Sequence, residues 1–440
     1  CSWMVYLVMT LVGSAVLGYV LLRLLVERAR TLVNAAFVFN FALMLVSAVA
    51  ASAVPPMAVF YVLLAGLWLL VYWMWRDKLE LVARLFSVSA QGLKCNPHLV
   101  TMVLGVKSML LAAAVPLVAG MAMAYQNGAV VQNGIQKGDV CYSEEGSPVP
   151  CCAWQTDRWV QPYLSFALLG GLWTTKLAFE VRIYTISGAV AQWYFAPAGA
   201  STRDTTLRAL RHALTASFGT LCLSSLVLTA VEVARSVSKR ARRDHRNILM
   251  CLVACVLECI YQLIEFVTQF ATIMAAITGL SFCGAAREVT DLLKRNFLSS
   301  YAVWWMPAFV LNSLVFSSSL AGASVVGFVY YAQALATKSA TPGWEAVMVG
   351  LMAMVVLLVV LAFFATIILD IVNVVYVCYA MDKDSNSVTR TEVHEVFVLL
   401  PVSAGAAVQN PDGDYQYAAP IPGSMTNLTS TPPPQGYTAP

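Results

Sequence analysis

The stretch from Trp344 to Met381, WEAVMVGLMAMVVLLVVLAFFATIILDIVNVVYVCYAM, decides the class of fold. Its only charged side chains are Glu345 and Asp370. A helix of about 20 apolar residues is enough to cross the roughly 30 Å hydrocarbon core of a bilayer. This stretch is apolar on all sides, whereas a helix lying on a surface carries a polar stripe. It therefore predicts a membrane-spanning helix.

The rest of the chain has the same character. Hydrophobic residues make up 59% of its 440 residues and charged residues only 11%, whereas a soluble domain carries about a quarter charged residues. Other apolar segments of spanning length are Trp3–Leu25, Leu32–Val54, Met57–Trp75, Leu99–Tyr125, and segments within 159–195, 207–234, 248–286 and 297–335. We predict an all-α polytopic integral membrane protein, with one domain over residues 1–400 and about eight to ten passes. Some of these helices are expected to be re-entrant or broken.

The loop at residues 126–158 is polar and more acidic than basic, and it carries Cys141, Cys151 and Cys152. Disulfides persist outside the cytosol, and acidic loops are common on that side. We therefore place the loop on the non-cytoplasmic side, with a disulfide between Cys141 and either Cys151 or Cys152.

The most basic run, residues 235–247, is predicted to be a cytoplasmic loop, because Lys and Arg concentrate on that side. Straight crossings at 159–195 and 207–234 would put this run on the same side as the loop 126–158. Either one segment bends back or the charge rule fails here. The number of crossings between residues 159 and 286 stays open.

Beyond Ala404 the chain is rich in Pro, Gly, Ser, Thr and Tyr. Such a segment cannot bury enough apolar surface to fold alone. We predict that residues 401–440 form a disordered cytoplasmic tail that could bind protein partners. The sequence begins at Cys1 rather than Met, so we expect a further segment upstream.

The sequence shows no pattern typical of an enzyme. Its four histidines are scattered, with no glycine-rich phosphate loop and no His, Cys and Asp set at metal-ligand spacing. We expect no metal and no cofactor. The basic residues cluster at loop ends without interleaved aromatic residues, so nucleic acid is not an expected partner, whereas membrane lipids are.

The segment 271–296, ATIMAAITGLSFCGAAREVTDLLKRN, is similar to the most recognisable stretch of the choline transporter-like family. The matching positions, in order, are Ile273, Met274, Ala275, Gly279, Phe282, Cys283, Ala285, Leu292, Leu293, Arg295 and Asn296. Residues 187–195, 207–219 and 377–382 resemble three further family segments, so the resemblance covers about residues 60–400. Two positions depart from the family pattern: Thr272 stands where Tyr is usual, and Asn373 stands where Asp is usual.

The resemblance implies transport of choline or a related amine such as ethanolamine, in exchange for protons. A quaternary ammonium has no hydrogen to donate, so aromatic faces and a counter-charge must recognise it. The residues expected to bind it are Trp173, Tyr184, Trp193 and Tyr194, with Gly188 and Gly279 permitting helix breaks at the cavity. The alternative for the aromatic residues is anchoring of helix ends at the lipid headgroups.

Ionisable side chains within apolar segments are costly, and they are functional candidates for that reason. Asp370, Glu180 and Glu258 are the expected groups for charge balance or proton coupling. Glu180 has an alternative role as the i,i+4 partner of Lys176. Glu258 shares a helix face with Glu265, and both would be solvated if that helix lies in the interface.

The sequence thus predicts a transporter in the plasma membrane, with an organelle membrane as the alternative location. The alternative function is a non-transporting structural subunit or scaffold of a larger membrane assembly. Asn373 and the polar tail leave that alternative open.

Overall fold

The computed structural model describes residues 2–50, 55–132, 135–137, 140–142, 148–196, 204–244, 248–337, 341–385, 388–391, 393, 407–409 and 415–417. Its helices are α1 (Ser2–Ala50), α2 (Pro55–Cys95), α3 (His98–Tyr125), α4 (Val160–Phe195), α5 (Thr205–Leu214), α6 (Phe218–Asp244), α7 (Ile248–Thr278), α8 (Phe282–Ala336) and α9 (Pro342–Asp384). Its strands are β1 (Gly128–Gln132), β2 (Ile135–Lys137), β3 (Val140–Tyr142), β4 (Pro148–Val149), β5 (Cys152–Thr156), β6 (Ala407–Gln409) and β7 (Tyr415–Tyr417).

Within the described ranges, seven helices are long and apolar enough to cross a membrane. Large apolar side chains point outward along them, such as Met109, which is 75% exposed, and Phe328, which is 71% exposed. Exposure of this kind suits lipid rather than water as the surrounding medium. The prediction of an all-α polytopic membrane protein is confirmed.

Helix α1 folds back on itself. Its 49 residues would span about 73 Å as one straight helix, and the backbone leaves helical geometry at Arg28. Tyr6 bonds to Gln333 near the end of α8, whereas Asn40 donates to Ser317 in the middle of α8 (2.6 Å). With α1 counted as two passes and the less apolar, 36-residue α4 added, the described helices fit the predicted eight to ten passes.

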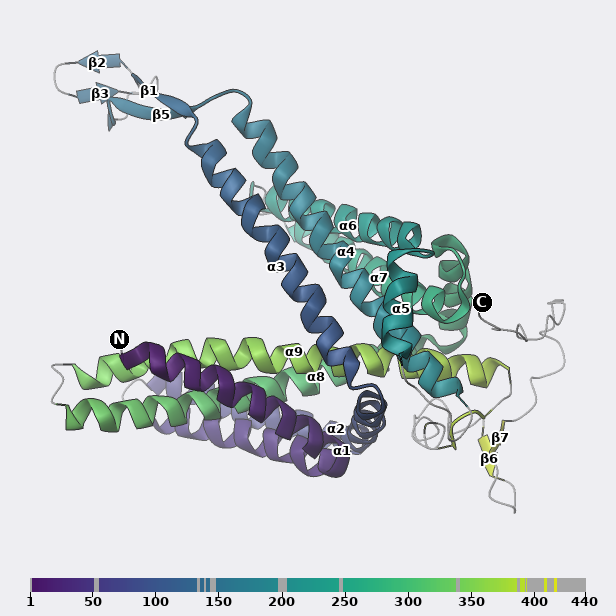
Figure 1. Cartoon of the computed structure of the whole chain (residues 1–440). Coiled ribbons are helices and arrows are strands. Elements are labelled where there is room, and N and C mark those ends of the chain that lie inside the picture. The colour runs from purple at the N-terminus through teal and green to yellow at the C-terminus, as the bar shows by residue number, and fades with distance from the viewer. Residues whose placement is uncertain are drawn as a thin grey trace.

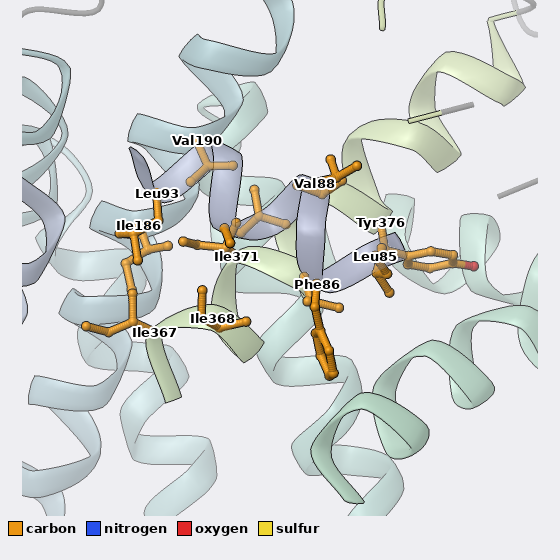
Figure 2. Close-up of a cluster of buried hydrophobic side chains, with 14 of the residues drawn as sticks. Leu85, Phe86, Val88, Leu93, Ile186, Val190, Ile367, Ile368, Ile371 and Tyr376 are labelled. Atoms are coloured by element: carbon orange, nitrogen blue, oxygen red, sulfur yellow. The ribbon is translucent and has the colours of Figure 1, made fainter. Parts of the chain in front are cut away.

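Helices α1, α2, α8 and α9 lie side by side, and α3 and α4 diverge from them toward the strands β1–β5 (Figure 1). The core lies where α2, α4 and α9 meet at the opposite end (Figure 2). Phe86 of α2, Ile186 of α4 and Ile371 of α9 are all fully buried there. Because lipid tails are as apolar as these side chains, close van der Waals packing rather than escape from water holds this core together.

The loop between α3 and α4 forms small antiparallel sheets. Strand β1 pairs with β5, and β3 lies between β2 and β4. A disulfide joins Cys141 to Cys151, with their Cα atoms 5.0 Å apart, whereas Cys152 is a free thiol. The predicted disulfide is confirmed, and Cys151 rather than Cys152 is the partner.

Helices α4 and α6 run antiparallel, with the short α5 between them. Tyr184 contacts Ser217 just before α6 begins, and Lys176 contacts Glu232 farther along α6. Arg235 therefore lies toward the end of α4 that carries the disulfide loop. The helix arrangement thus places residues 235–244 toward the side of the disulfide loop, whereas the charge rule predicts the cytoplasmic side. Residues 245–247 lie outside the described residues. The side of the membrane on which this run lies stays a prediction.

The one described glycine with a positive φ angle marks a break between two helices. Gly279 has φ 75° and follows the last residue of α7. This backbone conformation carries no steric cost in glycine. It lets the chain leave α7 and enter α8 without a long loop.

Only β6 and β7 of the carboxy-terminal tail are described, and they pair as antiparallel strands. The other residues of 401–440 lie outside the described residues, so the predicted disorder stays a prediction.

Candidate functional site

Two helices, α4 and α9, each become continuously buried at the same level of the bundle. In α4, exposed and partly exposed residues predominate until Phe179, and every residue from Glu180 to Ala191 is buried. In α9, burial becomes continuous from Asp370 to Ala380. The charged residues Glu180, Arg182 and Asp370 thus lie at the start of the continuously buried stretches of α4 and α9.

Arg182 and Asp370 form a buried ion pair between α4 and α9. The Arg182 Nε lies 3.1 Å from the Asp370 Oδ2, and the two residues are 7% and 4% exposed. The Arg182 guanidinium also lies 4.7 Å from the ring centre of Phe179. The ammonium of Lys107, from α3, lies 4.9 Å from the ring centre of Phe363 on α9. The carboxylate of Asp370 is therefore balanced by the guanidinium of Arg182.

Glu180 has no such charged partner in the part of the chain that the structure describes. Its side chain is fully buried, and the Thr272 hydroxyl of α7 donates to its Oε2 (2.5 Å). Since that hydroxyl proton is engaged, Ser224 of α6 donates to Thr272 (3.0 Å). The Oε1 of Glu180 has no hydrogen-bond partner among the described residues, nor does any described cation lie within ion-pair distance of this carboxylate. A buried ionised carboxylate without a counter-charge is costly, so this site favours a cation or a proton.

Two of the predicted aromatic residues share the helix face of Glu180. Trp173 precedes it by seven residues and Tyr184 follows it by four, which places all three on one side of α4. Trp173 Nε1 donates to Ser225 of α6 (3.0 Å), and the Tyr184 hydroxyl contacts Ser217 (2.7 Å). Trp173, Glu180 and Tyr184 therefore line the contact between α4 and α6.

The other two predicted aromatic residues lie elsewhere. Trp193 is 13 residues beyond Glu180 on α4, which corresponds to about 20 Å along the helix. The guanidinium of Arg390 lies 4.8 Å from the Trp193 ring centre, and the neighbouring Tyr194 donates its hydroxyl to Asp382 (3.0 Å). The structure does not bring Trp193 and Tyr194 together with Glu180.

The predicted helix-break glycines have different roles. Helix α4 runs unbroken through Gly188. A Cβ atom there would lie only 3.0 Å from the Cβ of Ala209, so the absence of a side chain lets α5 approach α4 closely. Gly279 does lie at a break, between α7 and α8.

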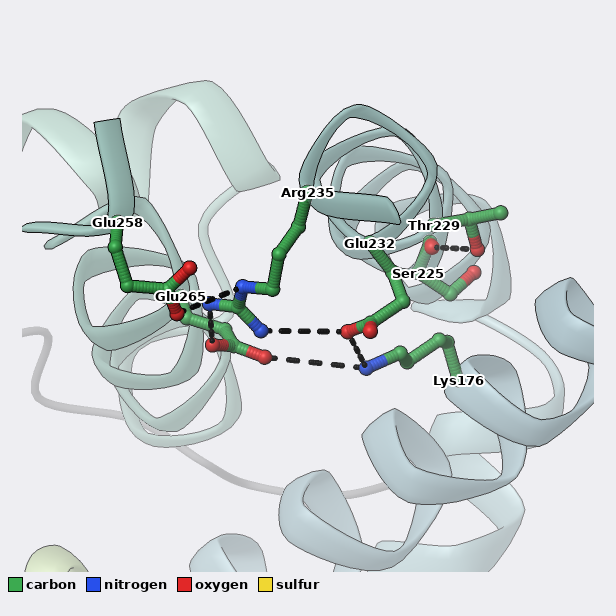
Figure 3. A network of polar contacts seen from close by, with 7 residues as sticks. All are labelled: Lys176, Ser225, Thr229, Glu232, Arg235, Glu258 and Glu265. Atoms are coloured by element: carbon green, nitrogen blue, oxygen red, sulfur yellow. Dashed lines mark hydrogen bonds and ion pairs between the residues drawn. The ribbon is translucent and has the colours of Figure 1, made fainter. Parts of the chain in front are cut away.

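Glu258 belongs to a separate network that joins α4, α6 and α7 (Figure 3). Arg235 is its centre, lying 3.1 Å from Glu258, 2.9 Å from Glu265 and 3.4 Å from Glu232. Lys176 pairs with Glu232 (3.5 Å) and Glu265 (3.9 Å) rather than with the carboxylate four residues along its own helix. These side chains are partly exposed, and their pairing suits a clamp between helices.

The sequence interpretation missed the hydroxyl groups around Glu180. Thr272 could have been singled out from the sequence, because it stands where the family pattern has Tyr. Arg182 was visible as an ionisable residue in an apolar segment, but its pairing with Asp370 depends on how α4 meets α9. Arg390 gave no signal, because it lies in a polar segment.

A model of the family described as plasma-membrane choline transporter matches residues 59–384. The chain belongs to the choline transporter-like family. This confirms the resemblance, and Lys107, Glu180 and Asp370 all lie within the matched region, whereas Arg390 lies beyond it. Such membership supports a transporter rather than an enzyme.

Individual relatives of this family are distant from the chain. A CTL-like protein of Dictyostelium discoideum is 26% identical over 250 residues, covering 54% of this chain and 44% of the relative. Choline transporter-like 1 of Anopheles gambiae is 25% identical over 235 residues, covering 50% and 32%. Choline transporter-like protein 4 of Danio rerio is 29% identical over 140 residues, covering 29% and 19%. The matched regions span less than half the length of each of these relatives.

Proposed function

We propose that this protein transports choline or a related amine across a membrane, in exchange for protons. One observation carries the proposal: Glu180 is fully buried, keeps one carboxylate oxygen unpartnered among the described residues, and begins the continuously buried stretch of α4. Family membership supports the transport role. The description of the family model supports the plasma membrane as its location.

Of the two buried carboxylates, Glu180 suits a cationic cargo better than Asp370. The charge of Asp370 is already matched by Arg182 at 3.1 Å. A cargo cation there would have to displace a guanidinium, and it would meet the repulsion of Arg182 itself. Glu180 offers a negative charge without a competing cation at ion-pair distance in the described part. Asp370 then acts by holding Arg182 in place.

The surroundings of Glu180 fit a quaternary ammonium. Trp173 and Tyr184 lie on the same face of α4, and aromatic faces attract ammonium groups that cannot donate hydrogen bonds. Thr272 holds the other carboxylate oxygen in a fixed orientation. The cargo would therefore approach Oε1 along the face of α4 that carries Trp173 and Tyr184, about 10 Å and 6 Å from Glu180 along the helix.

Proton exchange follows from the same carboxylate. When no cargo is bound, a proton on Oε1 removes the cost of a buried charge. When the ammonium arrives, the proton leaves and the ion pair takes its place. One positive charge then moves in each direction per cycle, so an opposing proton gradient drives uptake.

Uptake of labelled choline into proteoliposomes that contain the purified protein, with and without a pH gradient, tests the proposal. Wild-type protein should show saturable uptake that the gradient accelerates. Glu180→Gln keeps the size of the side chain and removes its charge, so uptake should fall at least about tenfold, the effect of roughly 1.4 kcal/mol. The matched control is Glu288→Gln, an exposed carboxylate on α8, which should leave uptake unchanged.

Two results would contradict the proposal. Gradient-driven uptake that survives Glu180→Gln would remove Glu180 from the mechanism. Well-folded wild-type protein that moves neither choline nor ethanolamine would favour the structural subunit instead.

A further inference from the structure

We infer that a carboxy-terminal latch closes the end of the transport path that lies opposite the disulfide loop. The latch consists of Ser385, residues 388–391 and Val393. Its Arg390 places a positive charge against the ring of Trp193. The latch rests on the proposed function for its role in transport. The latch residues lie beyond the region that the family model matches, whereas the residues that they contact on α4 and α9 lie within it.

Arg390 binds the carboxyl end of α4 in three ways. Its Nη2 donates to the carbonyl oxygen of Trp193 (2.7 Å), and its Nε donates to that of Tyr194 (3.2 Å). Its guanidinium also lies 4.8 Å from the Trp193 ring centre, within cation–π range. The last carbonyl groups of a helix have no partner within the helix and carry partial negative charge. A guanidinium with several donors therefore suits this helix end.

Asp382 fixes the latch to α9 and α4 together. Thr389 donates its backbone N–H to the Asp382 Oδ2 (3.0 Å) and its hydroxyl to Oδ1 (3.0 Å). The Tyr194 hydroxyl of α4 donates to the same Oδ2 (3.0 Å). Asp382 is 3% exposed, so this carboxylate receives three hydrogen bonds out of contact with water. Val393, 1% exposed, anchors the far side of the latch among apolar side chains.

The Trp193 ring is enclosed by α2 and by the latch. A Cβ atom on Gly92 of α2 would lie 3.3 Å from its Cζ3, and Arg390 covers it from the latch. The residue is 5% exposed. A cargo ammonium can reach Trp193 only after Arg390 has left. The Arg390 guanidinium thus occupies the position at the Trp193 ring that a departing cargo ammonium would need at this end.

The closed end and the divergent end fit one state of an alternating-access cycle. Helices α3 and α4 separate from α8 and α9 toward the disulfide loop (Figure 1), whereas α4 and α9 are held together by Asp382 and Arg390 at the other end. Release of cargo at the latched end requires α4 and α9 to separate there. Loss of the Arg390 contacts should therefore favour opening of this end.

The native thiol of Cys378 reports such opening without any cargo. It is fully buried on α9, one turn before Asp382. Its alkylation by N-ethylmaleimide in the purified full chain, followed by mass spectrometry, is compared with that of Cys283, an exposed thiol on α8. Arg390→Gln should raise the ratio of the two rates about tenfold, a change of about 1.4 kcal/mol in the opening equilibrium.

Two further variants separate opening from general damage. Arg208→Gln removes an exposed arginine from α5 at the same end and should leave the ratio unchanged. Thr389→Ala removes a single hydrogen bond to Asp382 and should raise the ratio by less than Arg390→Gln does. An Arg390→Gln protein with the wild-type ratio would overturn the latch, and so would an equal rise in Arg208→Gln.

Choline flux distinguishes this inference from the proposed function. If wild-type protein transports choline and the Cys378 ratio rises in Arg390→Gln, both proposals stand. If no amine is moved but the ratio still rises, closure of this end stands and the transport proposal fails. If transport is found while the ratio stays constant, the latch alone is overturned.

Discussion

Replacement of Arg182 by Met should strongly destabilise the protein, because it breaks the buried ion pair with Asp370. Arg182 and Asp370 are 7% and 4% exposed, and their side chains approach to 3.1 Å. Met is also unbranched, fills the space of the aliphatic part of Arg, and carries no charge. The variant would leave the Asp370 carboxylate buried beside α4 without its counter-charge.

The expected size of the effect follows from the burial of the pair. Removal of one partner from a buried ion pair costs about 3–5 kcal/mol, because the remaining charge stays out of water. Unfolding entropy of about 2.1 cal/mol/K per residue gives roughly 0.9 kcal/mol/K for a chain of this length. The midpoint of thermal unfolding should therefore fall by at least about 3 °C, and by more if the helices stay formed in the unfolded state.

The double variant Arg182→Met with Asp370→Leu is the control for this reasoning. Replacement of both charges by apolar side chains of similar volume is often neutral or stabilising, so the double variant should regain most of the loss. The assay is the intrinsic tryptophan fluorescence of purified protein in one detergent at one heating rate. A single variant as stable as wild type, or a double variant no better than the single one, would refute the account of a buried, mutually dependent pair.

Three other predictions concern the outer parts of the molecule. Arg235→Met should lower stability by about 1–3 kcal/mol, less than Arg182→Met because the carboxylates of its network are about a third exposed; a thermal midpoint equal to wild type would contradict this. Peptide mapping without reduction should recover Cys141 linked to Cys151, and Cys151→Ser should lower the stability of the loop by up to about 3 kcal/mol, whereas Cys152→Ser should have no effect. Lys239→Cys introduces a thiol at an exposed position of α6. If this thiol and Cys152 lie on one side of the membrane, an impermeant maleimide should label both in intact cells. Labelling of Cys152 alone would support the charge rule instead.

Much of the fold could be predicted from the sequence because lipid imposes a simple requirement. A segment such as Trp344–Met381 cannot leave its backbone groups unpaired in a bilayer, so it must be helical. Local composition is therefore enough to find the helices and the disulfide loop. The reversal of α1 at Arg28 was expected only as a connection between two apolar segments, and the structure shows that it has no separate loop.

The candidate site could be predicted only in part. Ionisable residues in apolar segments identified Glu180 and Asp370 as candidates, because such residues are costly in a membrane. Each partner comes from another helix: Thr272 of α7 contacts Glu180 of α4, and Arg182 of α4 contacts Asp370 of α9. Spacing along one helix does not reveal such contacts. Lys176 shows the same limit, since its carboxylate partners lie on α6 and α7.

The sequence by itself determined that this protein is a helical membrane protein of the choline transporter-like family, because hydropathy and family motifs are local properties of the chain. Only the tertiary structure decided which charges neutralise one another. Asp370 and Glu180 look alike in sequence, each an acidic residue in an apolar helix. The packing of α4 against α9 gives Asp370 a guanidinium, whereas among the described residues the packing of α4 against α6 and α7 surrounds Glu180 with hydroxyl groups. The energy of a buried charge depends on what lies within a few ångströms of it, and those neighbours come from segments far away in the sequence.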